Sequence, residues 1–394
     1  MKRFLLFAVA AMLFVACSKD DPTIQPVIKQ QPNNEIWYTA TAKVSPYVAD
    51  VFGANIVSNV WNSATGEGVI TFDGEVKVIG EYAFFACDTL ISLIIPNGVT
   101  EIAGHAFYAI DTLTTVTIPD SVTTIGDSAF INCPKLAEFK GKYAADGGRC
   151  LIKDNTIIAY AEASGSTYDI PDGVTEIGAS TFYGCSSLTS VTIPDSVTTI
   201  GKSAFSCCPK LAEFKGKYAA DGGRCLIKDN TIVAYAEASG TTYDIPDGVT
   251  EIGASAFTGC FTLTGVTIPD SVTVIGDIAF SFCTSLKSVT IPDSVTEIGE
   301  AAFGACFCLT SVTIPDSVTE IGDMAFYSCT GISSVYCKAT TPPTLGVDVF
   351  LDNASDRKIY VLTESVEAFK SATNWSAYAD AIVGYDFGSD TVVE

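Results

Sequence analysis

A motif that recurs every 23 residues constrains the fold of this 394-residue chain more than any other feature. Most copies begin with Val-Thr-x-Ile-Gly and continue with Ala-Phe, Cys, Leu, Val and Ile-Pro in that order. The nine copies begin at Val76, Val99, Val122, Val174, Val197, Val249, Val272, Val295 and Val318. A unit this short cannot bury its own apolar side, so successive units must stack on one another. We therefore expect an elongated solenoid with one continuous core.

Two steps between the copies are 52 residues long, which is one repeat of 23 plus 29 further residues. These insertions are copies of each other, because residues 134–165 and 209–240 differ only at Ile158 and Val233. In each insertion, two β-rich runs flank an Asp-Asn pair, which is typical of a β-hairpin. We expect hairpins at about residues 141–169 and 216–244 that grow out of the solenoid.

A single unit combines a strand pattern with a short helical pattern. Val191 and Ile193 alternate with polar residues, which predicts a short strand with one solvent-facing side, and Pro194 ends that strand. Ala204 and the Phe and Cys that follow it have the apolar spacing of one short helical turn. The sequence therefore predicts a β-rich repeat solenoid with a strand and a short helical or 3-10 segment in each turn.

The repeated Leu-x-x-Val-x-Ile-Pro and Ala-Phe-x-x-Cys motifs resemble the bacterial BspA-type leucine-rich repeat over residues 76–337. The resemblance implies a right-handed superhelix with a parallel β-sheet along its concave side. Residues 35–75 and 338–394 resemble the N-terminal and C-terminal cap modules of such proteins. The resemblance also implies a surface protein that recognises or adheres to extracellular or host proteins by non-covalent binding.

The N-terminal residues resemble a lipoprotein signal peptide. Lys2 and Arg3 precede an apolar run, residues 4–15, that is too short to span a bilayer. The following Ala16-Cys17 completes a sequence that resembles a bacterial lipobox. That resemblance implies that residues 1–16 are removed and that Cys17 carries the lipid.

Residues 17–34 are predicted to be a flexible tether, because they are rich in Pro and Gln and lack apolar periodicity. The acidic Asp20-Asp21 pair resembles a signal for the outer face of the outer membrane. We expect a lipid-anchored protein of the outer membrane that is exposed on the cell surface. Its lipid is the only membrane contact that we expect.

Composition argues against several functions. The chain has 45 acidic and 22 basic residues, a net charge of −23, so phosphate backbones would repel it and nucleic acid is a poor partner. His105 is the only histidine, which disfavours a His-based metal site or catalytic triad, and it is expected to be a loop residue. Near-identical repeats give carboxylates near-identical environments, unlike a catalytic pair. We expect neither an enzyme nor a cofactor.

Two columns of chemically interesting side chains have simpler explanations. Eight cysteines lie three residues after the repeat phenylalanine: Cys87, Cys133, Cys185, Cys208, Cys260, Cys283, Cys306 and Cys329. Ile110 fills that position in one turn, which indicates a small buried site of core thiols, with disulfides or a zinc site as alternatives. Aspartates follow the repeat proline at residues 120, 172, 195, 247, 270, 293 and 316. Turn formation explains them better than a ladder of cation ligands does.

The outward positions of the predicted strands are the candidate binding surface on the concave face. We assign to it Thr115, Thr117, Glu138, Lys140, Ser190, Thr192, Glu213, Lys215, Thr267, Ser288, Thr290, Ser311, Thr313 and Tyr336. Eleven strands about 4.8 Å apart would span roughly 50 Å, which suits a protein surface or an extended glycan. A glycan-binding protein would need aromatic platforms, and Tyr336 is the only aromatic residue in this set. A structural surface protein without a dedicated ligand is the remaining alternative.

Overall fold

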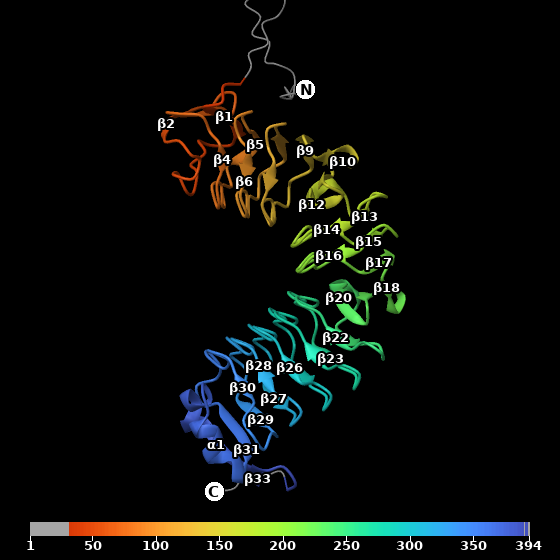
Figure 1. Cartoon of the computed structure of the whole chain (residues 1–394). Coiled ribbons are helices and arrows are strands. Elements are labelled where there is room, and N and C mark those ends of the chain that lie inside the picture. Colours follow the sequence, from red (N-terminus) through yellow and green to blue (C-terminus); the bar gives the residue numbers. More distant parts are fainter. Residues whose placement is uncertain (1–30, 390, 393–394) are drawn as a thin grey trace, which may run out of the picture.

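The computed structural model describes residues 31–389 and 391–392, which form a curved solenoid (Figure 1). Cys17 and the predicted signal peptide lie outside these residues. Most turns contribute one longer strand and one two-residue strand, so two columns of mainly parallel strands follow the solenoid. In the described part of the chain, no helix combines the length and the apolar character needed to cross a bilayer.

The longer strands form the first column, which we call the long-strand column. Figure 1 shows this column on the outer side of the curve and the two-residue strands on the inner side, so the expectation that the candidate surface lies on the concave face is wrong. Its strands in the repeat region are β5 (Leu90–Ile94), β7 (Thr115–Ile118), β9 (Glu138–Gly141), β13 (Thr167–Asp169), β15 (Ser190–Ile193), β17 (Glu213–Gly216), β21 (Thr242–Asp244), β23 (Gly265–Thr267), β25 (Ser288–Thr290), β27 (Ser311–Ile314) and β29 (Ser334–Cys337). The central apolar side chain of each strand is buried, as at Val116 and Val191, because strand geometry turns alternate residues to opposite sides. The eleven expected strands are therefore confirmed.

The Thr-x-Ile part of each unit forms the second column, which we call the short-strand column. It contains β4 (Val78–Ile79), β6 (Glu101–Ile102), β8 (Thr124–Ile125), β14 (Glu176–Ile177), β16 (Thr199–Ile200), β22 (Glu251–Ile252), β24 (Val274–Ile275), β26 (Glu297–Ile298), β28 (Glu320–Ile321) and β30 (Thr344–Leu345). Ile102, Ile177 and Ile252 of this column are fully buried. Each turn is thus closed by backbone pairing on two sides.

The Ala-Phe segments form the third side of each turn and stack their rings along the solenoid. The ring centroids of Phe280 and Phe303 are 5.2 Å apart with almost parallel planes, and Phe303 and Phe326 repeat this arrangement. The short helical or 3-10 segment expected here is absent from the described turns, because the backbone forms successive tight turns in which residues such as Ala301 adopt positive φ. The stacking explains why phenylalanine recurs at this position.

The two insertions are longer turns of the solenoid. The first contains β10 (Ala144–Ala145), η1 (Asp146–Gly148), β11 (Cys150–Lys153), β12 (Thr156–Tyr160) and η2 (Glu162–Ser164). The second contains β18 (Ala219–Ala220), η3 (Asp221–Gly223), β19 (Cys225–Lys228), β20 (Thr231–Tyr235) and η4 (Glu237–Ser239).

The hairpin expected in each insertion is present, because β11 pairs with β12 and β19 pairs with β20 in antiparallel register. The expectation that it grows out of the solenoid is wrong. β12 continues in parallel pairing with β14, and β20 does so with β22, so each hairpin belongs to the short-strand column. The 29 extra residues of each insertion therefore lengthen one turn of the solenoid.

The core is divided where these long turns occur, so the expectation of one continuous core is also wrong. Buried apolar residues fall into three clusters that extend from Ile36 to Ala161, from Cys150 to Ala236 and from Cys225 to Ile382. The long-strand column is interrupted between β9 and β13 and between β17 and β21, and a third interruption lies between β25 and β27. The long turns separate their flanking strands, which breaks both the pairing and the core.

Both ends of the solenoid are closed. At the N-terminal end, β1 (Glu35–Ala40) pairs antiparallel with β5, and β3 (Glu67–Phe72) and β2 (Ile56–Asn62) complete that sheet. At the C-terminal end, β31 (Lys358–Leu362) and β32 (Ile382–Asp386) extend the long-strand column in parallel, and β33 (Thr391–Val392) pairs with β32. Between β31 and β32 lie η5 (Thr363–Ser365), α1 (Val366–Ser371) and η6 (Trp375–Ala381). The buried Trp375 covers Phe350, the last ring of the Phe stack.

Candidate binding surface

The outward side chains of the long-strand column form two rows, one on each side of the buried central residue. Strand register places equivalent residues of neighbouring turns next to one another, for example Thr267 beside Thr290 and Thr313 beside Tyr336. Neighbouring strands in a sheet are about 4.8 Å apart. The rows therefore present hydroxyl groups at a regular spacing within each run of paired strands.

The structure places thirteen of the fourteen predicted surface residues where solvent reaches them. The exposed ones are Lys215, Thr267, Ser288, Thr290 and Ser311. The partly exposed ones are Thr115, Thr117, Glu138, Lys140, Thr192, Glu213, Thr313 and Tyr336. A partner could therefore contact these thirteen side chains in the folded protein, without any turn having to unfold.

Ser190 is the exception, because only 9% of its surface is accessible. Its register partners are Thr167 on β13 and Glu213 on β17. Serine is the smallest of these three side chains, so its longer neighbours restrict solvent access to it. The prediction of Ser190 as an outward contact residue is wrong.

The strands that precede the two long turns carry ion pairs in these rows. Lys140 Nζ lies 3.1 Å from Glu138 Oε2, and Lys215 Nζ lies 3.0 Å from Glu213 Oε2. Each pair is two residues apart on one strand, so both members lie on the same side of the sheet. The rows are otherwise mainly Thr and Ser, and each duplicated strand adds one neutralised pair of charges.

The predicted cysteine column is confirmed as a column of buried free thiols. Within the described residues, no group of three or more His, Cys, Asp or Glu side chains is placed to hold a metal ion. The seven aspartates that follow the repeat proline are exposed. Core packing therefore explains the cysteine column, and turn formation explains the aspartate column.

A family model described as a BspA type leucine rich repeat region matches residues 55–144, 157–218 and 232–371 in six copies. The chain belongs to the BspA-type leucine-rich repeat family. These matches cover well over half of the chain and include both columns of strands.

Solved structures of bacterial leucine-rich repeat proteins are similar to this BspA-type chain. A leucine rich cell surface protein from Faecalibacterium prausnitzii is 27% identical, with 78% of this chain and 86% of that chain covered and a TM-score of 0.46. A leucine rich repeat protein from T. pallidum is 34% identical, with coverage of 50% and 80% and a TM-score of 0.32. One from Bacteroides ovatus is 28% identical, with coverage of 74% and 83% and a TM-score of 0.31. A search of curated proteins gave no match.

Sequence reasoning missed an aromatic cluster at the C-terminal end of the long-strand column. Tyr336 stacks on Tyr360 with ring centroids 4.8 Å apart, and Tyr385 contacts both rings at 5.4 and 5.2 Å. Phe387 packs against Tyr385 at 5.0 Å, and all four side chains are partly exposed. The alternation of Ile359, Tyr360 and Val361 could have revealed β31 as a further repeat strand with Tyr360 facing outward.

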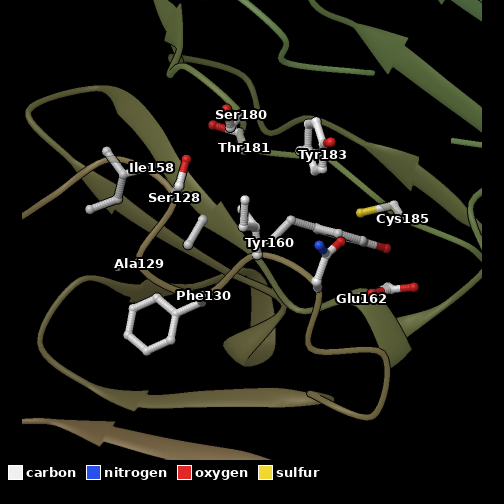
Figure 2. A pocket seen from close by; sticks show the side chains of 13 residues that line it. Ser128, Ala129, Phe130, Ile158, Tyr160, Glu162, Ser180, Thr181, Tyr183 and Cys185 are labelled. Carbon is white, nitrogen blue, oxygen red and sulfur yellow. The ribbon is translucent and has the colours of Figure 1, made fainter. Parts of the chain in front are cut away.

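A small cavity lies where the first long turn meets its neighbours. Ser128 and Phe130 lie on one side of Tyr160, and Tyr183 and Cys185 lie on the other (Figure 2). The cavity volume of about 20 Å³ is room for one water-sized group. It is too small for a sugar or a peptide side chain.

Glu162 borders this cavity and has a structural role. The backbone N–H and the hydroxyl of Ser186 both donate to Glu162 Oε1, at 2.7 and 2.6 Å. In the second copy Phe261 replaces that serine, so the buried Glu237 carboxylate lacks the hydroxyl donor and has only the nearby backbone N–H groups of Phe261 and Thr262 to oppose the cost of burial. Burial raises the pKa of Glu237.

Proposed function

We propose that this chain is a surface-displayed lipoprotein that recognises extracellular or host proteins by non-covalent binding along the long-strand column. The observation that carries the proposal is the pair of outward rows of Thr and Ser, which are accessible over successive paired strands. Such an extended and rigid face suits a macromolecule better than a metabolite, since small-molecule sites are concave and enclose most of the ligand. The lipid on Cys17 would hold this body at the outer membrane, and no covalent chemistry is part of the proposed role.

The binding proposal is tested with a soluble fragment of residues 31–394 screened against extracellular-matrix proteins. Thr192→Arg and Thr290→Arg each place a bulky charge in one outward row, so we expect affinity for a true partner to fall at least about tenfold. Thr199→Arg is the matched control, because it adds the same charge to an exposed position of the short-strand column. Equal loss in all three variants, or in none, would place binding outside the long-strand column.

The anchoring proposal has a separate test in the native bacterium. External protease on intact cells should remove the body of the protein from the surface. Cys17→Ala should release the protein from membranes, because the lipid is the proposed anchor. Full protection from protease, or retention of the Cys17→Ala protein, would contradict this part of the proposal.

The aromatic cluster of Tyr336, Tyr360, Tyr385 and Phe387 favours glycan binding as the second candidate. Tyrosine combines a large apolar ring with a hydroxyl that can hydrogen-bond. Binding of a glycan that is lost in Tyr360→Ala and kept in Thr192→Arg would make this candidate the better account. A glycan array that shows no binding to the soluble fragment would exclude it.

A further inference from the structure

Five aromatic side chains form one surface cluster beside the first two turns, which we call the aromatic patch: Tyr47, Tyr82, Phe85, His105 and Tyr108. Tyr82 stacks on His105 with ring centroids 5.2 Å apart, and Phe85 stacks on Tyr108 at 5.4 Å. Tyr47 meets Phe85 edge to face at 5.0 Å. The rings come from segments that follow β4 and β6 and from the cap segment between β1 and β2 (Figure 1).

The rings of the patch are not needed to fill the core. Phe84 and Phe107 of the same two turns are fully buried, whereas Tyr47 is 66% exposed and Tyr82 is 36% exposed. A later turn has serine, Ser203, at the repeat position of Tyr82 and His105, and its short strand still pairs with the preceding one, so no ring is needed there for folding. Exposed clusters of large apolar side chains commonly mark interaction sites.

Acidic residues predominate near the patch in the sequence. Asp50, Glu81, Asp88 and Asp111 each lie within three residues of a patch ring, and the nearest basic residue is Lys43, four residues from Tyr47. Asp88, Asp111 and Asp50 are exposed, and Glu81 Oε1 lies 3.8 Å from His105 Nδ1. Ring faces and carboxylates both attract cations, so the patch has the chemistry that binds a guanidinium or ammonium group.

The geometry of the rings also limits what else can bind. Tyr82 and His105, and Phe85 and Tyr108, turn their faces toward each other with interplanar angles of 15° and 16°. Each stack covers one face of each of its two rings, so a ligand can approach only the opposite ring faces. Cations are attracted to ring faces, and the carboxylates beside these rings favour a cationic side chain over a neutral sugar ring.

We infer that the aromatic patch docks an arginine- or lysine-bearing segment of a partner protein. The inference rests on the proposed function, since it gives a protein-recognition solenoid a second contact surface near its N-terminal end. A guanidinium group would lie against Tyr82 or Tyr47 and pair with Glu81. Because the whole chain carries a charge of −23, its long-range field would attract the same basic segment.

The probe is a fluorescein-labelled peptide of four Gly-Arg repeats, titrated with the fragment of residues 31–394 at 150 mM salt. A Gly-Glu peptide of the same length is the negative probe. The Tyr82→Ala/Tyr108→Ala variant removes two rings without changing charge, and we expect at least a fivefold loss of affinity. Glu81→Gln is a milder surface change that should weaken binding two- to threefold.

Tyr327→Ala is the matched control, because Tyr327 occupies the same repeat position as Tyr108 in a later turn. It should bind the Gly-Arg peptide like the unaltered fragment. Equal affinity of the ring-deleted and unaltered fragments would show diffuse attraction to the acidic surface and would overturn the inference. Absence of peptide binding would also overturn it, and the Thr192→Arg test would still decide the proposed function independently.

Discussion

Each cysteine thiol of the repeat column from Cys133 onward donates toward the solenoid backbone wherever its contact is resolved. Cys283 Sγ lies 3.2 Å from the carbonyl oxygen of Phe257, and Cys329 Sγ lies 3.0 Å from that of Phe303. In each of these contacts the nearest acceptor is the carbonyl oxygen of the phenylalanine one turn earlier, so the thiol links consecutive turns. Cysteine thus combines the size of a small apolar residue with a weak donor.

Burial should make these column thiols unreactive in the folded protein. It raises the pKa of Cys133 to about 12, and the thiolate is the reactive form. Cys308 is exposed. A pulse of iodoacetamide on the native fragment at pH 7.5, followed by mass spectrometry, should modify Cys308 more than about tenfold faster than the column thiols.

Cys308→Ser is the control for this labelling, because it should remove the fast adduct and leave the slow ones. Denaturant should make all thiols react at similar rates. Fast modification of Cys133 or Cys283 in the native fragment would show that the turns open readily or that the thiols are not buried.

The two glutamates of the long turns provide a matched pair for stability. Burial raises the pKa of Glu237 above its usual value, so folding favours its protonated form. This stabilising preference is complete below the unfolded-state pKa and is lost as pH rises through the folded-state pKa. At pH 7, Glu237→Gln should therefore stabilise the fragment by about 1 kcal/mol in urea denaturation.

Glu162→Gln should have the opposite effect, because a neutral amide oxygen is a weaker acceptor than the carboxylate for the two hydrogen bonds that Ser186 donates. This weakening should cost about 1 kcal/mol at pH 7. The stabilisation by Glu237→Gln should shrink below pH 4, where Glu237 is protonated in both the folded and the unfolded protein. A gain that is independent of pH would contradict burial of the charge as its cause.

At the scale of elements, spacing alone predicted the longer strand of each unit, since Val191 and Ile193 recur at fixed distances, but it placed Ile200 in a connection and did not predict the short strand there. It also predicted the hairpins from the Asp-Asn turns. It did not predict where the hairpins lie, because their direction depends on the pairing of Thr156 with Glu176 and of Ile157 with Ile177. Such register depends on how the turns stack, so no short stretch of the sequence predicts it.

The candidate binding surface was likewise predicted only in part. The period predicted which side of each strand faces solvent, and thirteen of fourteen residues agree. It failed at Ser190, whose access is set by side chains on neighbouring strands, and it did not find Tyr360 because the strand lies outside the regular repeat. The aromatic patch was missed because Tyr82 and His105 occupy a position that has no fixed residue type in the repeat, where four other turns have serine.

A glycine at the end of each strand that precedes a long turn tests how tightly these elements pack. Gly141 has φ of +82°, and a Cβ there would lie 2.0 Å from the carbonyl oxygen of Ile118. Gly147 also has positive φ, yet a Cβ there would meet nothing within 4 Å. Gly141→Ala should therefore destabilise the fragment by about 2 kcal/mol more than Gly147→Ala does.

Thermal or urea denaturation of both variants measures this difference. The second copy provides a replicate, because a Cβ on Gly216 would lie 2.2 Å from the carbonyl oxygen of Ile193. Similar stabilities of Gly141→Ala and Gly147→Ala would mean that the strand end moves away from Ile118 at little cost.

At the scale of the whole molecule, the division of the core into three clusters should divide the unfolding as well. In a solenoid, each turn contacts mainly its neighbours, so local loss of stability spreads along the chain only as far as the coupling between turns allows. The long turns interrupt the Phe stack, which runs from Phe84 to Phe130 and resumes with Tyr160 and Phe182. Coupling should be weakest at these interruptions.

Phe303→Ala tests this coupling, because Phe303 is fully buried between Phe280 and Phe326. Loss of the ring should cost about 3–5 kcal/mol locally. In native-state hydrogen exchange, amides of residues 225–382 should exchange faster, while those of residues 36–161 should keep their protection. Phe107→Ala should reverse the pattern, and a uniform loss of protection in either variant would show that the three clusters unfold as one unit.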